Sequence, residues 1–271
     1  MKMLWPVAAS LLLAISGCSK ASSDAPAANS ANQATASDFV STPIQDISGN
    51  APESVRKAIT EHLKIADLPA HITAIVPTEM PNLYWVTFRE VPPVFISGDG
   101  KFLLQGDLNK LGNGTVTNLT EALNAQETKR QLTAFPEKEM IIFSPASKPK
   151  AVIYAFTDVD CGYCRKMHSE INQVTAKGIE VRYIPWPRSE EDVAKNKAVW
   201  CSEDRQSAFT TATSGLSVQA PVCDDPVMNG RRVGMIVGVN GTPAIYDANG
   251  KYLGGYIPAN QLAKILKIDS K

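Results

Sequence analysis

Apolar residues gather first at residues 4–15, after Lys2, the only charged side chain in this part of the chain. The run is shorter than the about 20 residues that a membrane-spanning helix requires. Small residues and Cys18 follow it, as is typical of a signal removed from an exported protein, so residues 1–17 are expected to be a targeting signal. Residues 18–38 are mainly Ser, Ala, Asn, Thr and Gln, which predicts a flexible tether because there is little to bury.

The pattern changes at Asn50, where helical spacing begins. Asn50 is a suitable N-cap, Pro52 suits a first helical turn, and apolar residues recur at helical spacing from Val55 to Leu63. Apolar and turn residues then predict short strands at residues 71–76, 83–88, 94–97 and 101–105. A Gly-Asp-Gly turn joins the last two strands. One helix and four strands predict a small α+β domain, which we place at residues 39–115.

Residues 116–136 are predicted to be a linker helix. Asn118 can cap it with Glu121 three residues later, and good helix formers continue to about residue 133. Few of its residues are apolar, which is typical of a connecting helix. A peripheral helix packed on either domain would have the same pattern.

A second domain is placed at residues 137–271. Apolar strands are predicted at residues 140–143, 151–156 and 179–184, with a helix that starts at Cys161 and ends at Gly178, so the order is that of a βαβ unit. A long helical region follows from about residue 190. The chain then has Gly-Thr-Pro at 241–243, strands at 244–246 and 252–256 around an Asn-Gly turn, and a last helix.

Composition limits the function. The chain has 271 residues, 44% of them hydrophobic and 20% charged, which fits two modest soluble domains after the signal and tether are subtracted. Acidic and basic residues number 27 each, without a cluster of Lys and Arg. We therefore expect no nucleic-acid partner, because such binding depends on concentrated positive charge.

Cys161 and Cys164 form a C-x-x-C pair where a strand leads into a helix. The free N–H groups and positive dipole end of a helix N-terminus favour a thiolate at the first cysteine, and a thiolate is the nucleophile of disulfide exchange. The second cysteine lies one turn inside and can resolve a mixed disulfide. A zinc site completed by Cys201 and Cys223 is the alternative, but these two do not form a second C-x-x-C, so no metal is expected.

Cys201 and Cys223 are predicted to form a structural disulfide around the helical region, with a second redox pair as the alternative. That pairing leaves one of the five cysteines without a partner. Ile15-Ser16-Gly17-Cys18 resembles the lipobox of bacterial lipoproteins, so Cys18 is expected to carry a lipid. Ser19 then indicates the outer membrane by analogy with lipoprotein sorting. An ordinary cleaved signal, with Cys18 nearby by chance, is the alternative.

Four stretches together resemble the family of periplasmic thiol:disulfide isomerases that includes DsbC and DsbG, and its DsbC members more closely. They are FTDVDCGYCRKMH at 156–168, VRYIPWPR at 181–188, VWC ending at Cys201, and GVNGTPAIYDANGKYLGGYIP at 238–258. GDGKFLLQGDL at 98–108 is a weaker match. The resemblance implies a cystatin-like α+β dimerisation domain, joined by the linker helix to an α/β thioredoxin-like catalytic domain with a helical insertion.

By this resemblance the protein is a periplasmic homodimer that isomerises or reduces the disulfides of misoxidised exported proteins through a mixed disulfide at Cys161. Thr242 and Pro243 form a loop with a cis proline against the cysteines, and they bind substrate together with Gly162 and Tyr163. The resemblance also implies an inner-membrane electron donor of the DsbD type. No cofactor is expected.

Charged side chains near the cysteines have two interpretations each. His168 could tune a thiolate, but its place on an amphipathic helix predicts a partly exposed bystander. Asp158 and Asp160 could relay protons if buried, or act as strand-end and capping residues. Arg165 and Lys166 could add positive potential or be solvated surface charges.

Two other functions would use the same sequence features. A net dithiol oxidase would hold the C-x-x-C pair oxidised. A periplasmic chaperone or binding lipoprotein would use a dimer cleft and leave the cysteines incidental.

Overall fold

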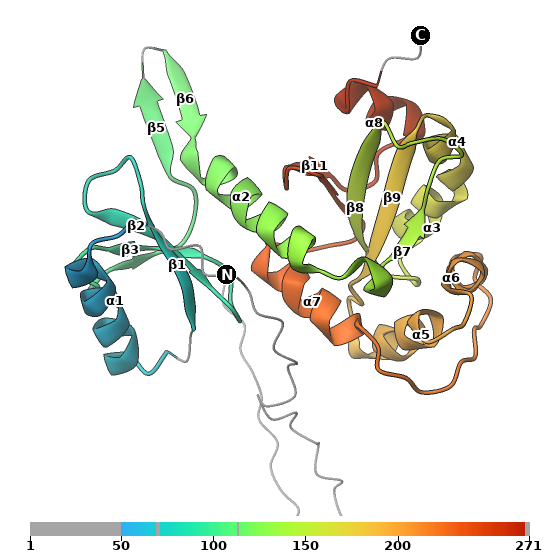
Figure 1. Cartoon of the computed structure of the whole chain (residues 1–271), viewed down its shortest axis with the longest axis horizontal. Helices are drawn as coiled ribbons and strands as arrows, with labels where there is room; N and C mark the ends of the chain where they lie inside the picture. Colours follow the sequence, from blue (N-terminus) through green and yellow to red (C-terminus); the bar gives the residue numbers. More distant parts are fainter. Residues whose placement is uncertain (1–49, 69–70, 113, 269–271) are drawn as a thin grey trace, which may run out of the picture. The chain divides into compact units, whose positions relative to one another are not determined.

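The computed structural model describes residues 50–68, 71–112 and 114–268 (Figure 1). The predicted signal at 1–17, the tether at 18–38 and the lipidation site Cys18 lie outside these residues. Among the described residues, no helix combines the length and the apolar character needed to cross a bilayer.

The first folded part is a helix against an antiparallel sheet of order β1-β2-β3-β4 (Figure 1). Its elements are α1 (Glu53–Ile65), β1 (Ile72–Pro77), β2 (Leu83–Phe88), β3 (Val94–Ser97) and β4 (Leu103–Leu104). Ile59 of α1 packs in one cluster with Val86 and Ile96 of the sheet. The predicted bounds of β2 and β3 are confirmed. The predicted cap at Asn50 is wrong, because Pro52 has an extended ψ of 148° and the helix begins after it.

A hairpin that the hydrophobic pattern did not predict follows this sheet. Its strands are β5 (Asn109–Gly112) and β6 (Thr115–Asn118), and their side chains are almost all exposed. The prediction of a linker helix from residue 116 is therefore wrong by three residues at its start. A strand without a buried face lacks the alternation of apolar and polar residues from which a strand is predicted.

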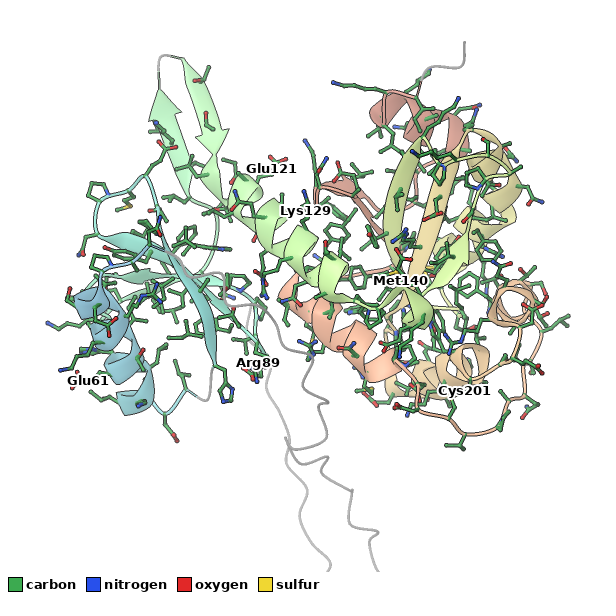
Figure 2. The ribbon with its side chains drawn as sticks, viewed as in Figure 1. Glu61, Arg89, Glu121, Lys129, Met140 and Cys201 are labelled. Carbon is green, nitrogen blue, oxygen red and sulfur yellow. A yellow bond between two sulfur atoms is a disulfide. The ribbon has the colours of Figure 1, made fainter. Side chains whose placement is uncertain are left out.

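The linker helix itself is α2 (Leu119–Ala134), which ends two residues earlier than predicted. Asn118 caps it as predicted, because the Asn118 side chain accepts a hydrogen bond of 3.0 Å from the Glu121 N–H. Glu121 and Lys129 are exposed side chains along this helix (Figure 2). At its C-terminal end Leu132 joins a core cluster with Phe156 of the second domain, so this end is packed rather than free.

The second domain is built on a five-stranded sheet of order β11-β10-β8-β9-β7. A short 3₁₀ helix, Glu137–Glu139, precedes it. Strands β8 and β9 are parallel neighbours and the other pairs are antiparallel. The strands are β7 (Ile141–Phe143), β8 (Ala151–Thr157), β9 (Ile179–Pro185), β10 (Ala244–Asp247) and β11 (Tyr252–Gly254). The predicted βαβ unit is confirmed, with β8 and β9 each one residue longer than expected.

The helix that begins at the cysteines is divided in two. It consists of α3 (Gly162–Ser169) and α4 (Ile171–Ala176), and Glu170 between them has the non-helical dihedrals φ −98° and ψ 8°. The Glu170 carboxylate accepts hydrogen bonds from the Tyr256 hydroxyl at 2.5 Å and from the Ala259 N–H at 3.2 Å. Ala259 starts the last helix, α8 (Ala259–Ile265). The single helix predicted here is therefore wrong, and the break coincides with these long-range contacts.

The predicted long helical region consists of α5 (Glu190–Trp200), α6 (Arg205–Thr213) and α7 (Val227–Ile236). Ser189 and Asp204 cap α5 and α6 through their side chains. Trp200 and Phe209 from these helices are completely buried against Tyr183 of β9, in the largest core cluster. The insertion is thus part of the core of this domain.

Candidate active site

Cys161 is the N-cap residue of α3, immediately beyond the loop that follows β8. Its N–H donates to the Asp158 carbonyl at 3.0 Å, and its own carbonyl accepts from the Arg165 N–H at 3.0 Å. Both Cys161 and Cys164 are free thiols, 4% and 1% exposed. The predicted strand-to-helix junction at the C-x-x-C pair is therefore present in the fold.

The structure places the loop before β10 against the first cysteine. The Thr242–Pro243 peptide bond is cis, and the Cys161 Sγ donates to the Thr242 carbonyl oxygen at 3.1 Å. Gly162 begins α3, and Tyr163 after it is 64% exposed. The four residues expected to bind substrate thus lie around Cys161.

The pKa values of the two thiols are shifted in opposite directions. The pKa of Cys161 falls to about 5, chiefly because the Cys164 thiol donates a hydrogen bond to the Cys161 thiolate. Burial opposes this effect, while hydrogen bonding by the Thr242 side chain and by the N–H groups of Cys164 and Tyr163 adds to it. Burial raises the pKa of Cys164, and the neighbouring Cys161 raises it further. Near neutral pH the site therefore holds a thiolate at Cys161 and a thiol at Cys164.

Asp158 lies buried behind the cysteines as a hydrogen-bonded carboxylate. It accepts from the Arg188 side chain at 2.8 Å and from the Asn196 amide at 3.0 Å. Burial favours the neutral acid, but the bonds from Arg188, Asn196 and backbone N–H groups outweigh it, so the pKa of Asp158 is lowered. Arg188 is the last residue of the VRYIPWPR stretch, whereas nothing in the sequence identified Asn196 as part of this network.

Asp160 faces two cations. Its carboxylate accepts from Lys195 at 2.5 Å and pairs with Arg165, and the bond from Lys195 is the main reason that the pKa of Asp160 is lowered. Arg165 also donates to the Val159 carbonyl at 3.0 Å. Arg165 therefore stabilises the loop before α3 in addition to contributing charge.

His168 is buried, and the prediction of a partly exposed bystander is wrong. It is 4% exposed, with Nε2 3.0 Å from the Thr210 hydroxyl and Nδ1 3.4 Å from the Tyr183 hydroxyl. Phe143 and Phe209 meet its ring edge to face. Burial lowers its pKa to about 4, so His168 is neutral at physiological pH. Helix α6 covers α3 here, which the spacing on α3 alone did not indicate.

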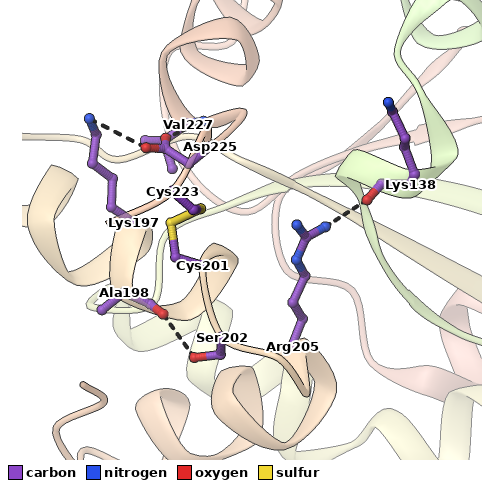
Figure 3. The surroundings of a disulfide bond; sticks show 9 residues. All are labelled: Lys138, Lys197, Ala198, Cys201, Ser202, Arg205, Cys223, Asp225 and Val227. Carbon is purple, nitrogen blue, oxygen red and sulfur yellow. Dashed lines mark hydrogen bonds and ion pairs between the residues drawn. A yellow bond between two sulfur atoms is a disulfide. The ribbon is translucent and has the colours of Figure 1, made fainter. Parts of the chain in front are cut away.

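The other two cysteines are bonded to each other. Cys201, at the C-terminal end of α5, and Cys223 form a disulfide with a Cα–Cα distance of 5.6 Å (Figure 3). The Lys197 ammonium also pairs with Asp225 at 3.4 Å across the same loop (Figure 3). In the part of the chain that the structure describes, no group of three or more His, Cys, Asp or Glu side chains could hold a metal ion.

A dithiol at the N-terminus of a helix, a strand that leads into it, and a cis proline against the first sulfur define a thioredoxin-fold thiol:disulfide oxidoreductase. Two family models match the chain accordingly. Residues 136–268 match the thioredoxin-like domain, and residues 23–121 match the disulfide bond isomerase protein N-terminal domain.

Curated relatives make the assignment more specific. The chain is 36% identical to the thiol:disulfide interchange protein DsbC of Escherichia coli K12 over 176 residues, which are 64% of this chain and 72% of the relative. It is 37% identical to DsbC of Salmonella typhimurium over 169 residues, covering 60% and 68%. The chain belongs to the DsbC family of thiol:disulfide interchange proteins, and it is an enzyme of the disulfide isomerase and oxidoreductase class.

Solved structures also match. A crystal structure of a disulfide interchange protein from Neisseria gonorrhoeae is 27% identical with a TM-score of 0.45, over 49% of this chain and 96% of that chain. A linker-deletion mutant of ScsC from Proteus mirabilis is 19% identical with a TM-score of 0.46, over 55% and 85%.

Proposed function

We propose that Cys161 is the nucleophile and Cys164 the resolving thiol of an enzyme that isomerises or reduces non-native disulfides in exported proteins. The observation that carries this proposal is the opposite acid strength of the two thiols. The pKa of Cys161 is about 5, and burial raises that of Cys164. Only one of the two is therefore ready to attack at neutral pH.

The reaction starts when the Cys161 thiolate attacks one sulfur of a substrate disulfide. A bond forms between the two sulfurs, the substrate disulfide breaks, and its second sulfur leaves as a thiolate that takes a proton from water. If a substrate thiolate attacks this mixed disulfide, Cys161 leaves as a thiolate and the substrate has a rearranged disulfide. This route consumes no electrons.

Attack by Cys164 leads to reduction instead. Cys164 must first lose its proton, after which the substrate leaves as a dithiol and the enzyme keeps a Cys161–Cys164 disulfide. Because burial favours the neutral thiol of Cys164, this route is slowed and a substrate thiol has more time to complete isomerisation. The oxidised enzyme then needs two electrons, and we assign their supply to an inner-membrane dithiol donor of the DsbD type.

Thr242, Pro243, Gly162 and Tyr163 are proposed to bind the substrate strand around its disulfide. The cis proline has no N–H of its own, and the adjacent Thr242 carbonyl already meets the Cys161 sulfur at 3.1 Å. An extended substrate segment at this loop would bring its sulfur to the same position.

The N-terminal domain is proposed to form a homodimer, which brings two active sites together. In support, β4 pairs only with β3 among the described strands, and Phe102, Leu103 and Leu104 are between 52% and 68% exposed. An exposed apolar edge strand favours pairing with a second chain. A dimer of this kind would also offer a surface for chaperone-like binding of unfolded substrates.

The division of the chain and its location are proposals too. We propose a signal at 1–17, a tether at 18–38, a dimerisation domain up to β6, the linker helix α2 and a catalytic domain at 137–271. The protein would act in the periplasm, tethered through a lipid on Cys18 to the outer membrane. Intact-mass measurement of the native protein tests the anchor, since a mature chain that begins at an unmodified residue would contradict it.

Refolding of scrambled ribonuclease tests the catalytic proposal. Wild-type enzyme is expected to restore activity, Cys161→Ser to lose this effect, and Cys164→Ser to keep part of the isomerisation while it loses net reduction. Equal recovery with wild type and Cys161→Ser would contradict the proposal and favour a chaperone. Trapping of the thiols in cells separates the enzyme from a net oxidase, for which Cys161 and Cys164 would be mainly oxidised.

A further inference from the structure

Two tyrosines lie together beside the C-x-x-C pair. Tyr163, between the cysteines, is 64% exposed. The Tyr256 ring lies nearly parallel to it, at an interplanar angle of 24° and a centroid distance of 6.1 Å. At this distance parallel rings are offset, so they form a continuous aromatic surface rather than a closed stack.

Two contacts hold Tyr256 in place. Its hydroxyl donates to the Glu170 carboxylate at 2.5 Å, and this bond raises the pKa of Tyr256. The Lys166 ammonium lies 4.7 Å from the Tyr256 ring centroid. Glu170 also accepts a hydrogen bond from the Ala259 N–H. The carboxylate of this residue, at the break between α3 and α4, therefore holds both the Tyr256 ring and the start of α8. Tyr256 is therefore positioned before any substrate arrives.

Tyr256 also borders the cis-proline loop. A Cβ placed on Gly255 would lie 3.5 Å from the Pro243 carbonyl oxygen, so the backbone before Tyr256 runs alongside this loop. Tyr163 follows Cys161 by two residues. The two rings thus lie next to the place where a substrate strand would meet Cys161.

We propose that Tyr163 and Tyr256 form a binding surface for an apolar or aromatic side chain next to the disulfide-bonded cysteine of the substrate. Tyr256 is a specificity-determining residue in this proposal, and Glu170 is a positioning residue that acts through it. The adjacent Lys166 ammonium disfavours a basic side chain at the same place by charge repulsion. Misoxidised proteins expose apolar side chains that native proteins bury, so this surface selects substrates that need repair. The inference rests on the proposed role of Cys161.

Reduction of two peptide disulfides by the full-length enzyme tests this inference. The peptides differ only in the residue next to the cysteine, Phe in one and Lys in the other. An aromatic contact of about 0.5–1.5 kcal/mol gives the wild type a preference for Phe of up to about tenfold in kcat/KM. Tyr256→Ala is expected to remove most of this preference through KM, and to slow reduction of the Phe peptide more than reduction of the small molecule 2-hydroxyethyl disulfide.

Matched variants distinguish the contribution of the Tyr256 ring from that of Glu170, which holds it in place. Tyr252→Ala removes a tyrosine that is 53% exposed on β11 and should leave the preference unchanged. Glu170→Gln keeps an acceptor oxygen and should retain the preference, whereas Glu170→Ala should reduce it. Because Glu170→Ala also frees the start of α8, its thermal unfolding is measured alongside, and Tyr256→Phe provides a second variant that loses only the hydroxyl.

The outcomes distinguish this inference from the proposed function. A full preference for Phe in Tyr256→Ala would overturn the inference, as would an equal loss of activity on 2-hydroxyethyl disulfide. Wild-type enzyme that reduces neither peptide, or Cys161→Ser that reduces both, would instead contradict the role of Cys161.

Discussion

Acid strength at single residues depends on what each side chain meets in the fold. Cys161 and Cys164 are both buried, yet the pKa of one is lowered and that of the other raised. The thiolate at Cys161 receives hydrogen bonds from a thiol and from helix N–H groups, whereas burial of Cys164 favours its neutral form. Nucleophile and resolving thiol thus differ by environment, although their chemistry is identical.

Alkylation by iodoacetamide tests this difference at Cys161. Because only the thiolate reacts, the rate should rise with pH around a midpoint near 5 and be level at pH 7. Cys164→Ala removes the main donor to the Cys161 thiolate, so the midpoint should move to higher pH. A wild-type midpoint close to that of an ordinary cysteine, about 8.5, would contradict the assignment.

His168 should make stability depend on acid pH. Its pKa falls from 6.5 to about 4 on folding, so below pH 6.5 the unfolded chain binds a proton that the folded chain does not. The free energy of unfolding should decrease as pH falls from about 6.5 to 4, by roughly 3 kcal/mol at most. Urea unfolding at several pH values measures this.

The control for His168 is a variant that does not titrate. His168→Gln keeps a polar side chain and should have a flatter dependence on pH over the same range, even if it is less stable throughout. If wild type and His168→Gln lose stability in parallel, His168 does not contribute to the loss.

At the scale of elements, the apolar pattern predicted the strands that pack on the core. It did not predict elements whose side chains are exposed or whose ends depend on distant contacts. Strands β2, β3, β8 and β9 were predicted to within one residue because most of their buried positions are apolar. The β5–β6 hairpin was missed because nearly all of its side chains are exposed. The break at Glu170 was missed because its hydrogen-bond partners, Tyr256 and Ala259, are nearly 90 residues away in the sequence.

The disulfide that closes the helical insertion should stabilise the second domain. Replacing both cysteines, Cys201→Ala with Cys223→Ala, should lower the free energy of unfolding by about 3 kcal/mol, since the open loop gives the unfolded chain more freedom. Denaturant unfolding measures this change. Val222→Ala, at a completely exposed neighbour of Cys223, is the control and should have no effect. A double variant as stable as wild type would show that the bridge is redundant.

At the scale of the whole molecule, isomerisation requires that substrate stays bound while its cysteines exchange partners. One active site with a small surface releases its substrate easily, whereas a dimer with two sites enclosing a cleft would retain it. The proposed dimer is therefore linked to the choice between isomerisation and simple reduction.

Charges on β4 should separate these two activities. Leu103→Asp with Leu104→Asp places two carboxylates on the exposed apolar edge, so the dimer should dissociate in analytical ultracentrifugation. Isomerisation of scrambled ribonuclease should fall, while reduction of 2-hydroxyethyl disulfide should persist. Met80→Asp, at an exposed residue of the β1–β2 turn, serves as control and should remain dimeric. A β4 variant that is still dimeric would contradict dimerisation through this edge.

The sequence by itself determined the order of the core strands and the position of the dithiol. A local pattern is sufficient for both, because burial of one face sets the spacing of apolar residues and a C-x-x-C pair at a helix start is continuous in the chain. The number and spacing of the cysteines also predicted the pairing of Cys201 with Cys223, and the resemblance indicated the cis-proline loop.

Only the tertiary structure decided which side chains surround these groups. Three groups of contacts join segments that are distant in the sequence. They are the burial of His168 under α6, the hydrogen bonds of Asn196 and Arg188 to Asp158, and the hydrogen bond of Tyr256 to Glu170. Such contacts leave no periodic trace in the sequence, since each depends on how separate elements pack. The pKa values that make Cys161 the nucleophile and Cys164 the resolving thiol also depend on this tertiary packing.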